Sequence, residues 1–236
     1  MIRVLANDPM GKQNDNALIV FARDPIEGQV KTRLNPFLDP RTTCDLYTCF
    51  LADSLNTICE VESADRFAGI YPSNLSGYFE QLDSSLSITV FMQEGKDLGE
   101  RMQNAFSARF QDGYERVVII GSDSPSLPTN YIRQAFASER DVVLGPSADG
   151  GYYLIGMRGK QIDVFDGIAW GGDTVLAETR TKLEAIEGAS LELLPVWYDV
   201  DRPEDLKFLK THLQLMADAG QQEGASTRNF LEQLSL

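Results

Sequence analysis

The stretch Ala17-Leu-Ile-Val-Phe-Ala22 is a continuous apolar run with the length of a β-strand. Runs of this kind are typical of parallel strands that are buried on both faces of a sheet. Further along the chain, Val117-Val-Ile-Ile-Gly121 has the same character. The two runs therefore predict central strands of a sheet that helices cover on both sides.

Helical patterns separate the predicted strands. Asp39 and Pro40 mark the start of one helix, because Asp is a favoured N-cap and Pro fits the first helical position. The further predicted strands are 66–71, 87–92, 141–145, 151–156 and 191–200, and the further predicted helices are 74–82, 97–113, 130–138, 173–187 and 203–219. This alternation predicts an α/β fold with a mostly parallel sheet. The directly joined strands within 141–156 indicate that the sheet is mixed.

We expect one main domain over residues 17–210. At roughly 150 residues per domain, a chain of 236 residues falls between one domain and two. No internal repeat or low-complexity linker divides it. Residues 1–16 are expected to form an N-terminal extension, and residues 211–236 a C-terminal helical tail.

The composition argues against several classes of function. Lys and Arg total 21 against 35 Asp and Glu, a formal net charge of −14, which argues against nucleic acid or an anionic membrane as partner. The one histidine, His212, cannot build a His-based zinc cluster. The three cysteines follow no zinc spacing and are too few for a disulfide framework. No apolar run approaches 18 residues, so we expect a cytoplasmic enzyme without a membrane partner.

Four unusual stretches, 23–34, 121–128, 145–152 and 199–205, follow predicted strands. In open α/β sheets, ligands bind outside the carboxyl ends of the strands. These stretches are therefore the candidates for a functional site.

The first of them, Arg23-Asp-Pro-Ile-Glu-Gly-Gln-Val-Lys-Thr-Arg-Leu34, is locally cationic. Between residues 17 and 41, four basic and three acidic residues give +1, so the rest of the chain carries −15. Lys31 and Arg33 lie close together after a turn at Gly28, which favours phosphate binding. A solvated loop with outward charges is the alternative. The chain contains neither a P-loop nor a dinucleotide-binding fingerprint.

The other three stretches supply carboxylates. Asp123 follows a strand of Val and Ile, and it either caps a turn or binds Mg²⁺, which prefers one or two carboxylates plus phosphate oxygens. Asp149 lies beside paired glycines, where it fits a turn or could act as a base. Asp199 and Asp201 are expected on the same side of a strand, where either could complete a metal site with Asp123. Asp201 could instead N-cap the next helix.

Together, these stretches resemble a bacterial glycosyltransferase-A-like family whose members are labelled arsenosugar-biosynthesis glycosyltransferase-like proteins. Residues 21–34 match the family signature Phe-x-Lys-x-Pro-x-x-Gly-x-Val-Lys-Thr-Arg-Leu, except that Arg23 replaces the first Lys. The other matching segments are 93–102, 121–125, 145–154, Trp170 and 199–205. The resemblance covers about residues 17–210.

This resemblance implies a nucleotide-diphospho-sugar transferase fold of the GT-A type, a Rossmann-like three-layer sandwich. It implies a divalent ion, Mg²⁺ or Mn²⁺, held by Asp123 with Asp201 as the better matched second ligand. It also implies a bound nucleotide or nucleotide sugar and a small-molecule acceptor. The residues expected at the nucleotide and its phosphates are Arg23, Gly28, Lys31, Thr32, Arg33 and Ser122.

The resemblance further implies a sugar-transfer reaction with Asp149 as the candidate base. The substrate-binding candidates are Gly150, Gly151, Tyr152 and Trp170, although two aromatic residues are equally typical of a core.

Ser122-Asp123-Ser124 stands where true glycosyltransferases carry Asp-x-Asp, and this difference leaves nucleotidyl transfer open. The expected function is therefore glycosyl transfer from a nucleotide-diphospho-sugar, with nucleotidyl transfer as the alternative. A non-catalytic nucleotide-sugar sensor is a third possibility.

Overall fold

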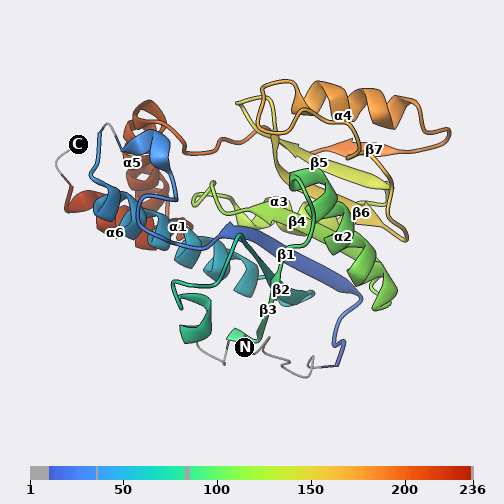
Figure 1. The fold of residues 1–236 in the computed structure, drawn as a ribbon, viewed down its shortest axis with the longest axis horizontal. Helices are drawn as coiled ribbons and strands as arrows, with labels where there is room; N and C mark the ends of the chain where they lie inside the picture. The colour runs from blue at the N-terminus through green and yellow to red at the C-terminus, as the bar shows by residue number, and fades with distance from the viewer. Residues whose placement is uncertain (1–10, 36, 83–85, 235–236) are drawn as a thin grey trace.

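The computed structural model describes residues 11–35, 37–82 and 86–234, which form a seven-stranded sheet in the order β3-β2-β1-β4-β6-β5-β7 (Figure 1). The β6 strand is antiparallel to its neighbours β4 and β5, and the other neighbouring pairs are parallel. The predicted mixed, mostly parallel sheet is thus confirmed. The strands are β1 (Asn16–Arg23), β2 (Asp65–Tyr71), β3 (Ile88–Met92), β4 (Arg116–Gly121), β5 (Val142–Pro146), β6 (Tyr152–Arg158) and β7 (Leu191–Leu193).

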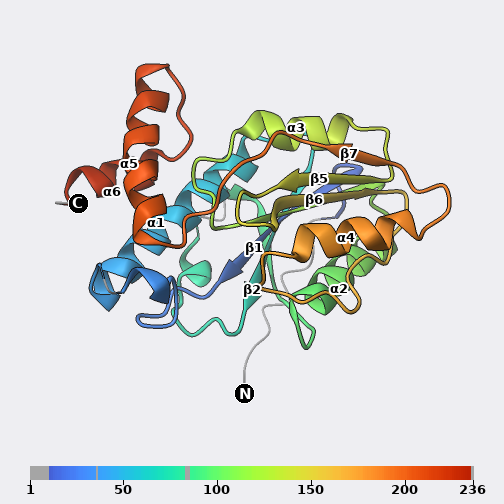
Figure 2. The ribbon, with the colours of Figure 1, turned by 90° about the horizontal axis from the view of Figure 1, so that it is seen from above.

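Helices cover both faces of this sheet and make it the middle of three layers (Figure 2). One core joins the sheet to α1, α3, α5 and α6, and the other joins it to α2 and α4. In β1, Leu18 and Val20 lie in the first core and Ala17 and Ile19 in the second, as a strand buried on both faces requires. The helices are α1 (Pro40–Cys59), α2 (Leu98–Gln111), α3 (Thr129–Ala137), α4 (Val175–Glu184), α5 (Pro203–Asp218) and α6 (Ala225–Glu232).

Some predicted elements are shorter than expected. The strand predicted over 191–200 ends at Leu193, shortly before Pro195, which has no N–H to donate to a ladder. Beyond it, an isolated bridge joins Trp197 to Ser147. The helix predicted over 74–82 is reduced to a 3-10 turn, η2 (Phe79–Gln81). The predicted start of α1 at its N-cap Asp39 is confirmed, and the helix predicted over 97–113 begins after Asp97, which is the N-cap of α2.

The C-terminal segment packs onto the main body of the protein. The boundary expected at residue 210 falls inside α5, and Leu213 and Leu231 belong to the same core as α1. The Asp53 carboxylate on α1 accepts hydrogen bonds from the backbone N–H groups of Ser226 and Thr227, each at 2.8 Å. These bonds stabilise the first turn of α6.

Most of the predicted N-terminal extension, residues 1–10, lies outside the described residues. The three cysteines are free thiols. His212 lies on α5, where its Nδ1 contacts the Tyr198 hydroxyl at 2.7 Å. In the described part of the chain, no helix combines the length and apolarity that crossing a membrane requires.

Candidate active site

The sheet order opens a crevice between β1 and β4. From β1 the sheet continues through β2 to β3 on one side, and from β4 it continues through β6 and β5 on the other. The carboxyl ends of the strands at such a reversal are the usual ligand site of an open α/β sheet. A cavity of about 520 Å³ lies there, and all four candidate stretches line it.

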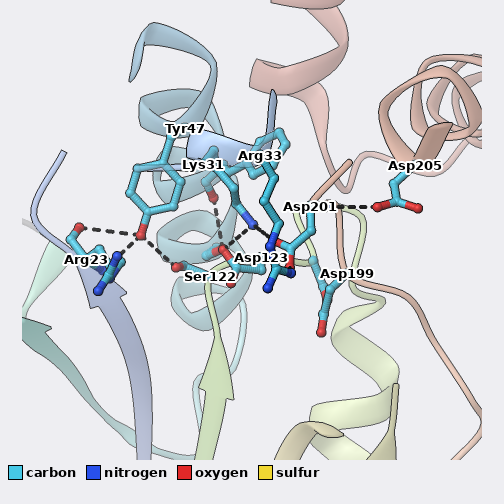
Figure 3. A network of polar contacts seen from close by, with 12 residues as sticks. Arg23, Lys31, Arg33, Tyr47, Ser122, Asp123, Asp199, Asp201 and Asp205 are labelled. Atoms are coloured by element: carbon cyan, nitrogen blue, oxygen red, sulfur yellow. Dashed lines mark hydrogen bonds and ion pairs between the residues drawn. The ribbon is translucent and has the colours of Figure 1, made fainter. Parts of the chain in front are cut away.

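Lys31 reaches across this cavity from the loop after β1 to carboxylates on two other segments (Figure 3). Its Nζ lies 2.6 Å from Asp123 Oδ1 and 2.8 Å from Asp201 Oδ1, and its side chain is 5% exposed. Arg33 Nη1 adds a contact of 3.1 Å to the other oxygen of Asp201. Burial alone would lower the pKa of Lys31, but Asp123 and then Asp201 outweigh it and raise that pKa. Lys31 is therefore a firmly protonated cation.

The backbone at Lys31 has an unusual conformation. Its φ of 46° and ψ of 37° lie in the left-handed region, which few residues other than glycine adopt. Lys31 directly precedes a 3-10 turn, η1 (Thr32–Leu34). Such strain costs on the order of 1 kcal/mol and persists where surrounding contacts hold the residue in place. The two ion pairs of Lys31 are contacts of that kind.

Asp201 is not the N-cap of α5, so that alternative is wrong. Arg202 holds the N-cap position, and the Asp205 carboxylate accepts the N–H groups of both Asp201 and Arg202 at 3.0 and 2.8 Å. The carboxylate of Asp201 is thereby free to meet Lys31 and Arg33. Burial would raise the pKa of Asp201, but Lys31 and then Arg33 outweigh it and hold that pKa below its ordinary value.

Asp199 and Asp201 face different partners, although we expected them on the same side of a strand. Residues 199–201 do not form a strand, and Asp199 points away from Lys31 (Figure 3). Its carboxylate accepts the hydroxyls of Ser124 and Ser147 at 2.5 and 3.0 Å. Burial, followed by the nearby charge of Asp123, raises the pKa of Asp199 to about 6. Of the two carboxylates, Asp201 is therefore the better candidate for a site shared with Asp123.

Tyr47 is a site residue that sequence reasoning missed. Its hydroxyl accepts the Arg23 N–H at 2.8 Å and contacts Ser122 Oγ at 2.9 Å, which ties the end of β1 to the end of β4. Burial raises the pKa of Tyr47 far above its ordinary value. In the sequence, Tyr47 appears only as one apolar position of a helix. Ser122 itself is buried and lines the cavity.

The glycine-rich loop after β5 contributes one carboxylate to the cavity wall. Asp149 Oδ1 accepts the Gly151 N–H at 3.0 Å, and both residues line the cavity. Gly150 has a φ of +94°, and a Cβ there would overlap the backbone of Asp173. Gly150 thus lets the loop before α4 approach, but it is not among the lining residues. Gly28, with a φ of +75°, also shapes a loop without lining the cavity.

Two aromatic residues form another part of the wall. Tyr152 and Trp170 pack edge to face, with ring centroids 6.4 Å apart. The Trp170 indole also lies so close to Gly99 that a Cβ there would approach its Nε1 to 2.5 Å. Both aromatic residues are therefore packed against protein and present only part of their surface to a ligand.

Arg101 is a second residue that the sequence did not single out. It lies in the first turn of α2, with its guanidinium 3.9 Å from the centre of the Tyr71 ring, and both residues line the cavity. The ion pairs found among the described residues do not include Arg101. The one sequence signal was its place within the matched segment 93–102.

This fold and site define a transferase with the nucleotide-diphospho-sugar transferase fold. The structure matches that of a candidate nucleotide-diphospho-sugar transferase from Desulfovibrio desulfuricans G20 with a TM-score of 0.83. The two are 33% identical, and the match covers 93% of this chain and 94% of that chain. The chain belongs to the same family as the Desulfovibrio protein. Residues 56–172 also match the family described as uncharacterized protein conserved in bacteria (DUF2064).

More distant relatives extend this comparison. The chain is 24% identical over 230 residues to a 2-phospho-L-lactate guanylyltransferase of Methanobrevibacter ruminantium, and the match covers 92% of both chains. A Mycobacterium tuberculosis H37Rv protein in complex with manganese shares the fold, with a TM-score of 0.50 and 17% identity over 83% of this chain and 97% of that one. The narrower resemblance to arsenosugar-biosynthesis proteins stays a prediction.

Proposed function

We propose that the protein is a metal-assisted nucleotidyltransferase that transfers a nucleoside monophosphate group to a small anionic acceptor. The observation that carries this proposal is the meeting of Lys31 with Asp123 and Asp201 in the crevice between β1 and β4. These contacts place carboxylates that can bind a metal next to cations that can bind phosphates. The similarity to a guanylyltransferase over 92% of both chains supports the nucleotidyl reaction.

The donor set fits Mg²⁺ or Mn²⁺ bound together with the nucleotide. Asp123 and Asp201 offer hard oxygen ligands and already converge on one positive charge. Within the described ranges, no group of three or more His, Cys, Asp or Glu side chains is placed to hold a metal. Phosphate oxygens and water would therefore complete the coordination. Such an ion neutralises charge on the reacting phosphates.

The remaining steps follow from the residues of the chain. In this proposal Arg23, Lys31 and Arg33 bind the phosphates of a nucleoside triphosphate through charge-assisted hydrogen bonds. An acceptor oxygen attacks the α-phosphorus, the bond to the bridging oxygen of the β-phosphate breaks, and pyrophosphate leaves. The cations stabilise the negative charge that develops in this transition state.

An acceptor phosphate or carboxylate is already ionised at neutral pH and needs no base. Asp149 would then help to position the acceptor rather than take its proton. The chain carries a formal net charge of −14, which disfavours nucleic acid as the acceptor. A small anion that contacts only the local cations of the crevice is the better candidate. A cytoplasmic location stays a prediction.

Glycosyl transfer is the second candidate, and the 33% identity to the Desulfovibrio protein favours it. In that reaction Asp149 would take the proton of an acceptor hydroxyl. Gly151, Tyr152 and Trp170 would line the sugar side of the cavity. We place this reaction second because Ser122 and Ser124, on either side of Asp123, are buried where a glycosyltransferase carries carboxylate.

Product analysis tests the proposal. The protein is incubated with Mn²⁺ or Mg²⁺, each of the four nucleoside triphosphates, and a panel of small phosphorylated acids that includes 2-phospho-L-lactate. Phosphorus NMR should show pyrophosphate release that requires both acceptor and metal, and that is lost in Asp123→Asn. Release of a nucleoside diphosphate from a nucleotide sugar would instead favour glycosyl transfer. Nucleotide binding without either product would favour the sensor.

A further inference from the structure

Lys31 contacts both carboxylates that the proposed function gives to the metal. Its ammonium contacts Oδ1 of Asp123 and Oδ1 of Asp201, and the second oxygen of Asp201 contacts Arg33. Three of the four carboxylate oxygens that could bind a divalent ion thus already face protein cations.

Two cations cannot share this position. A divalent ion bound by both carboxylates would lie within a few ångströms of the ammonium at its present place, and charges of the same sign repel strongly at such distances. Lys31 is buried, so water screens this repulsion only weakly. Metal binding to both carboxylates therefore requires Lys31 to move.

We infer that Lys31 is the counter-ion of the metal site in the nucleotide-free protein, and that nucleotide binding exchanges it for the divalent ion. This inference rests on the proposed function, which supplies the nucleotide and the metal. When phosphates enter, Lys31 finds new anionic partners, and Asp123 and Asp201 are released to bind the ion. The metal alone, without nucleotide, binds weakly because it must compete with Lys31.

The side chain of Lys31 suits such an exchange. Lysine has a flexible four-carbon stem and a compact charge, so its ammonium can move while the backbone stays in place. The Nζ lies over the Phe50 ring, 5.8 Å from its centre. Arg33, by contrast, is 62% exposed and contacts Asp201 alone, so it competes less.

A titration with Mn²⁺ alone tests the exchange, with the signal of free Mn²⁺ followed by electron paramagnetic resonance. Lys31→Met removes the charge and keeps a stem of similar shape. Lys160→Met is the matched control, because Lys160 is exposed and its loss changes the net charge equally. Arg33→Met tests the second cation. A thermal melt of each variant confirms that it is folded.

Without nucleotide, Lys31→Met should bind Mn²⁺ at least about tenfold more tightly than the wild type, a difference of ~1.4 kcal/mol. Arg33→Met should show a smaller gain, and Lys160→Met should show none. Asp123→Asn placed in the Lys31→Met background should remove the gain. If Lys31→Met does not fold, Lys31→Gln and Arg33→Met are measured in its place. Both must then bind Mn²⁺ more tightly than Lys160→Met does.

Equal Mn²⁺ affinity in Lys31→Met and the wild type would overturn the exchange. If that affinity is high and falls with Asp123→Asn, the metal site of the proposed function still stands. Absence of Mn²⁺ binding in every protein, with or without nucleoside triphosphate, would overturn both the exchange and the proposed metal site.

Discussion

Among the described residues, two of the cavities are of similar size and lie at opposite ends of the sheet. The crevice at the carboxyl ends of β1 and β4 measures about 520 Å³, and a second cavity beside the amino end of β2 measures about 560 Å³. In the second cavity, the Asp65 carboxylate accepts hydrogen bonds from Gln13, Asn14 and the Tyr114 hydroxyl. The hydrogen bonds of Asp65 therefore join separate segments of the chain and serve its stability. The volume of a cavity alone does not distinguish a binding site from a gap between packed segments.

The charges around the two cavities are also paired differently. Next to the second cavity, Arg109 pairs with Asp112 one helical turn away and lies over the Phe67 ring. In the crevice, Lys31 pairs with residues that are far away in the sequence and belong to two separate loops. A local ion pair such as Arg109 with Asp112 stabilises one helix. The cluster in the crevice instead gathers a cation that could bind phosphate and carboxylates that could bind a metal.

The largest effect on function is expected from Asp123→Asn. This change keeps the shape of the side chain and removes one of the two charges proposed for the metal. Transfer should fall by about 100-fold or more, as when other groups that stabilise transition-state charge are removed. The melting temperature of the protein without nucleotide should also fall, because Asp123 makes the closest ion pair of the buried Lys31. A melting curve beside the pyrophosphate assay checks both expectations, and normal transfer in this variant would contradict the assignment.

Asp199→Asn should stabilise the protein at neutral pH. The pKa of Asp199 is about 6 in the folded protein against an ordinary 3.8, so its ionisation opposes folding. The free-energy cost of ionising Asp199 reaches its maximum above about pH 6 and disappears below about pH 4. At pH 8 the variant should gain about 2 kcal/mol in the free energy of unfolding, since Asn can still bond to both serines. Denaturant unfolding at pH 8 and pH 4 measures it, and an equal free energy of unfolding at pH 8 would refute the prediction.

Asp65→Asn should have the opposite pattern. Burial would raise the pKa of Asp65, but the bonds from Gln13, Asn14 and Tyr114 outweigh it and lower that pKa. The stabilisation is thus present above the ordinary pKa of 3.8 and is lost as the pH falls below it. At pH 7 the variant should lose about 1–2 kcal/mol of stability. Its affinity for Mn²⁺ with nucleotide should match the wild type, and a loss there would mean that the two cavities are coupled.

Arg101→Met should have the smallest effect of the four. Arg101 lines the crevice and is stacked on Tyr71, where it can meet an anionic or planar part of a ligand. Nucleotide or acceptor affinity should fall by about tenfold or less, as for a single cation–π or charge-assisted contact. Calorimetry compares it with Arg180→Met, which removes an exposed arginine from α4. Equal affinities in the two variants would remove Arg101 from the site.

Much of the fold could be predicted from local patterns. The apolar runs at 17–22 and 117–121 became the neighbouring strands β1 and β4, because a strand buried on both faces must be apolar throughout. Asp39 capped α1 because its carboxylate accepts the N–H groups of Arg41 and Thr42. These features depend on residues that are close in sequence.

The contacts of the crevice depend on the order of the strands, which local patterns do not encode. The pairing of Lys31 with Asp201 joins loops that only the finished sheet brings together. The alternative that Asp201 caps the next helix was wrong, because Asp205, three residues after the N-cap, accepts the N–H groups of Asp201 and Arg202. Tyr47 could not be separated from a core residue, because its ring is buried while its hydroxyl serves the site.

We propose that the crevice binds a nucleotide and a divalent ion together. The most direct test is calorimetry of each nucleoside triphosphate with the wild-type protein, once with Mn²⁺ and once with a chelator. At least one nucleotide should bind at least about tenfold more tightly with Mn²⁺, and by reciprocity it should strengthen Mn²⁺ binding by the same factor. Equal affinities with Mn²⁺ and with chelator for every nucleotide would contradict the claim.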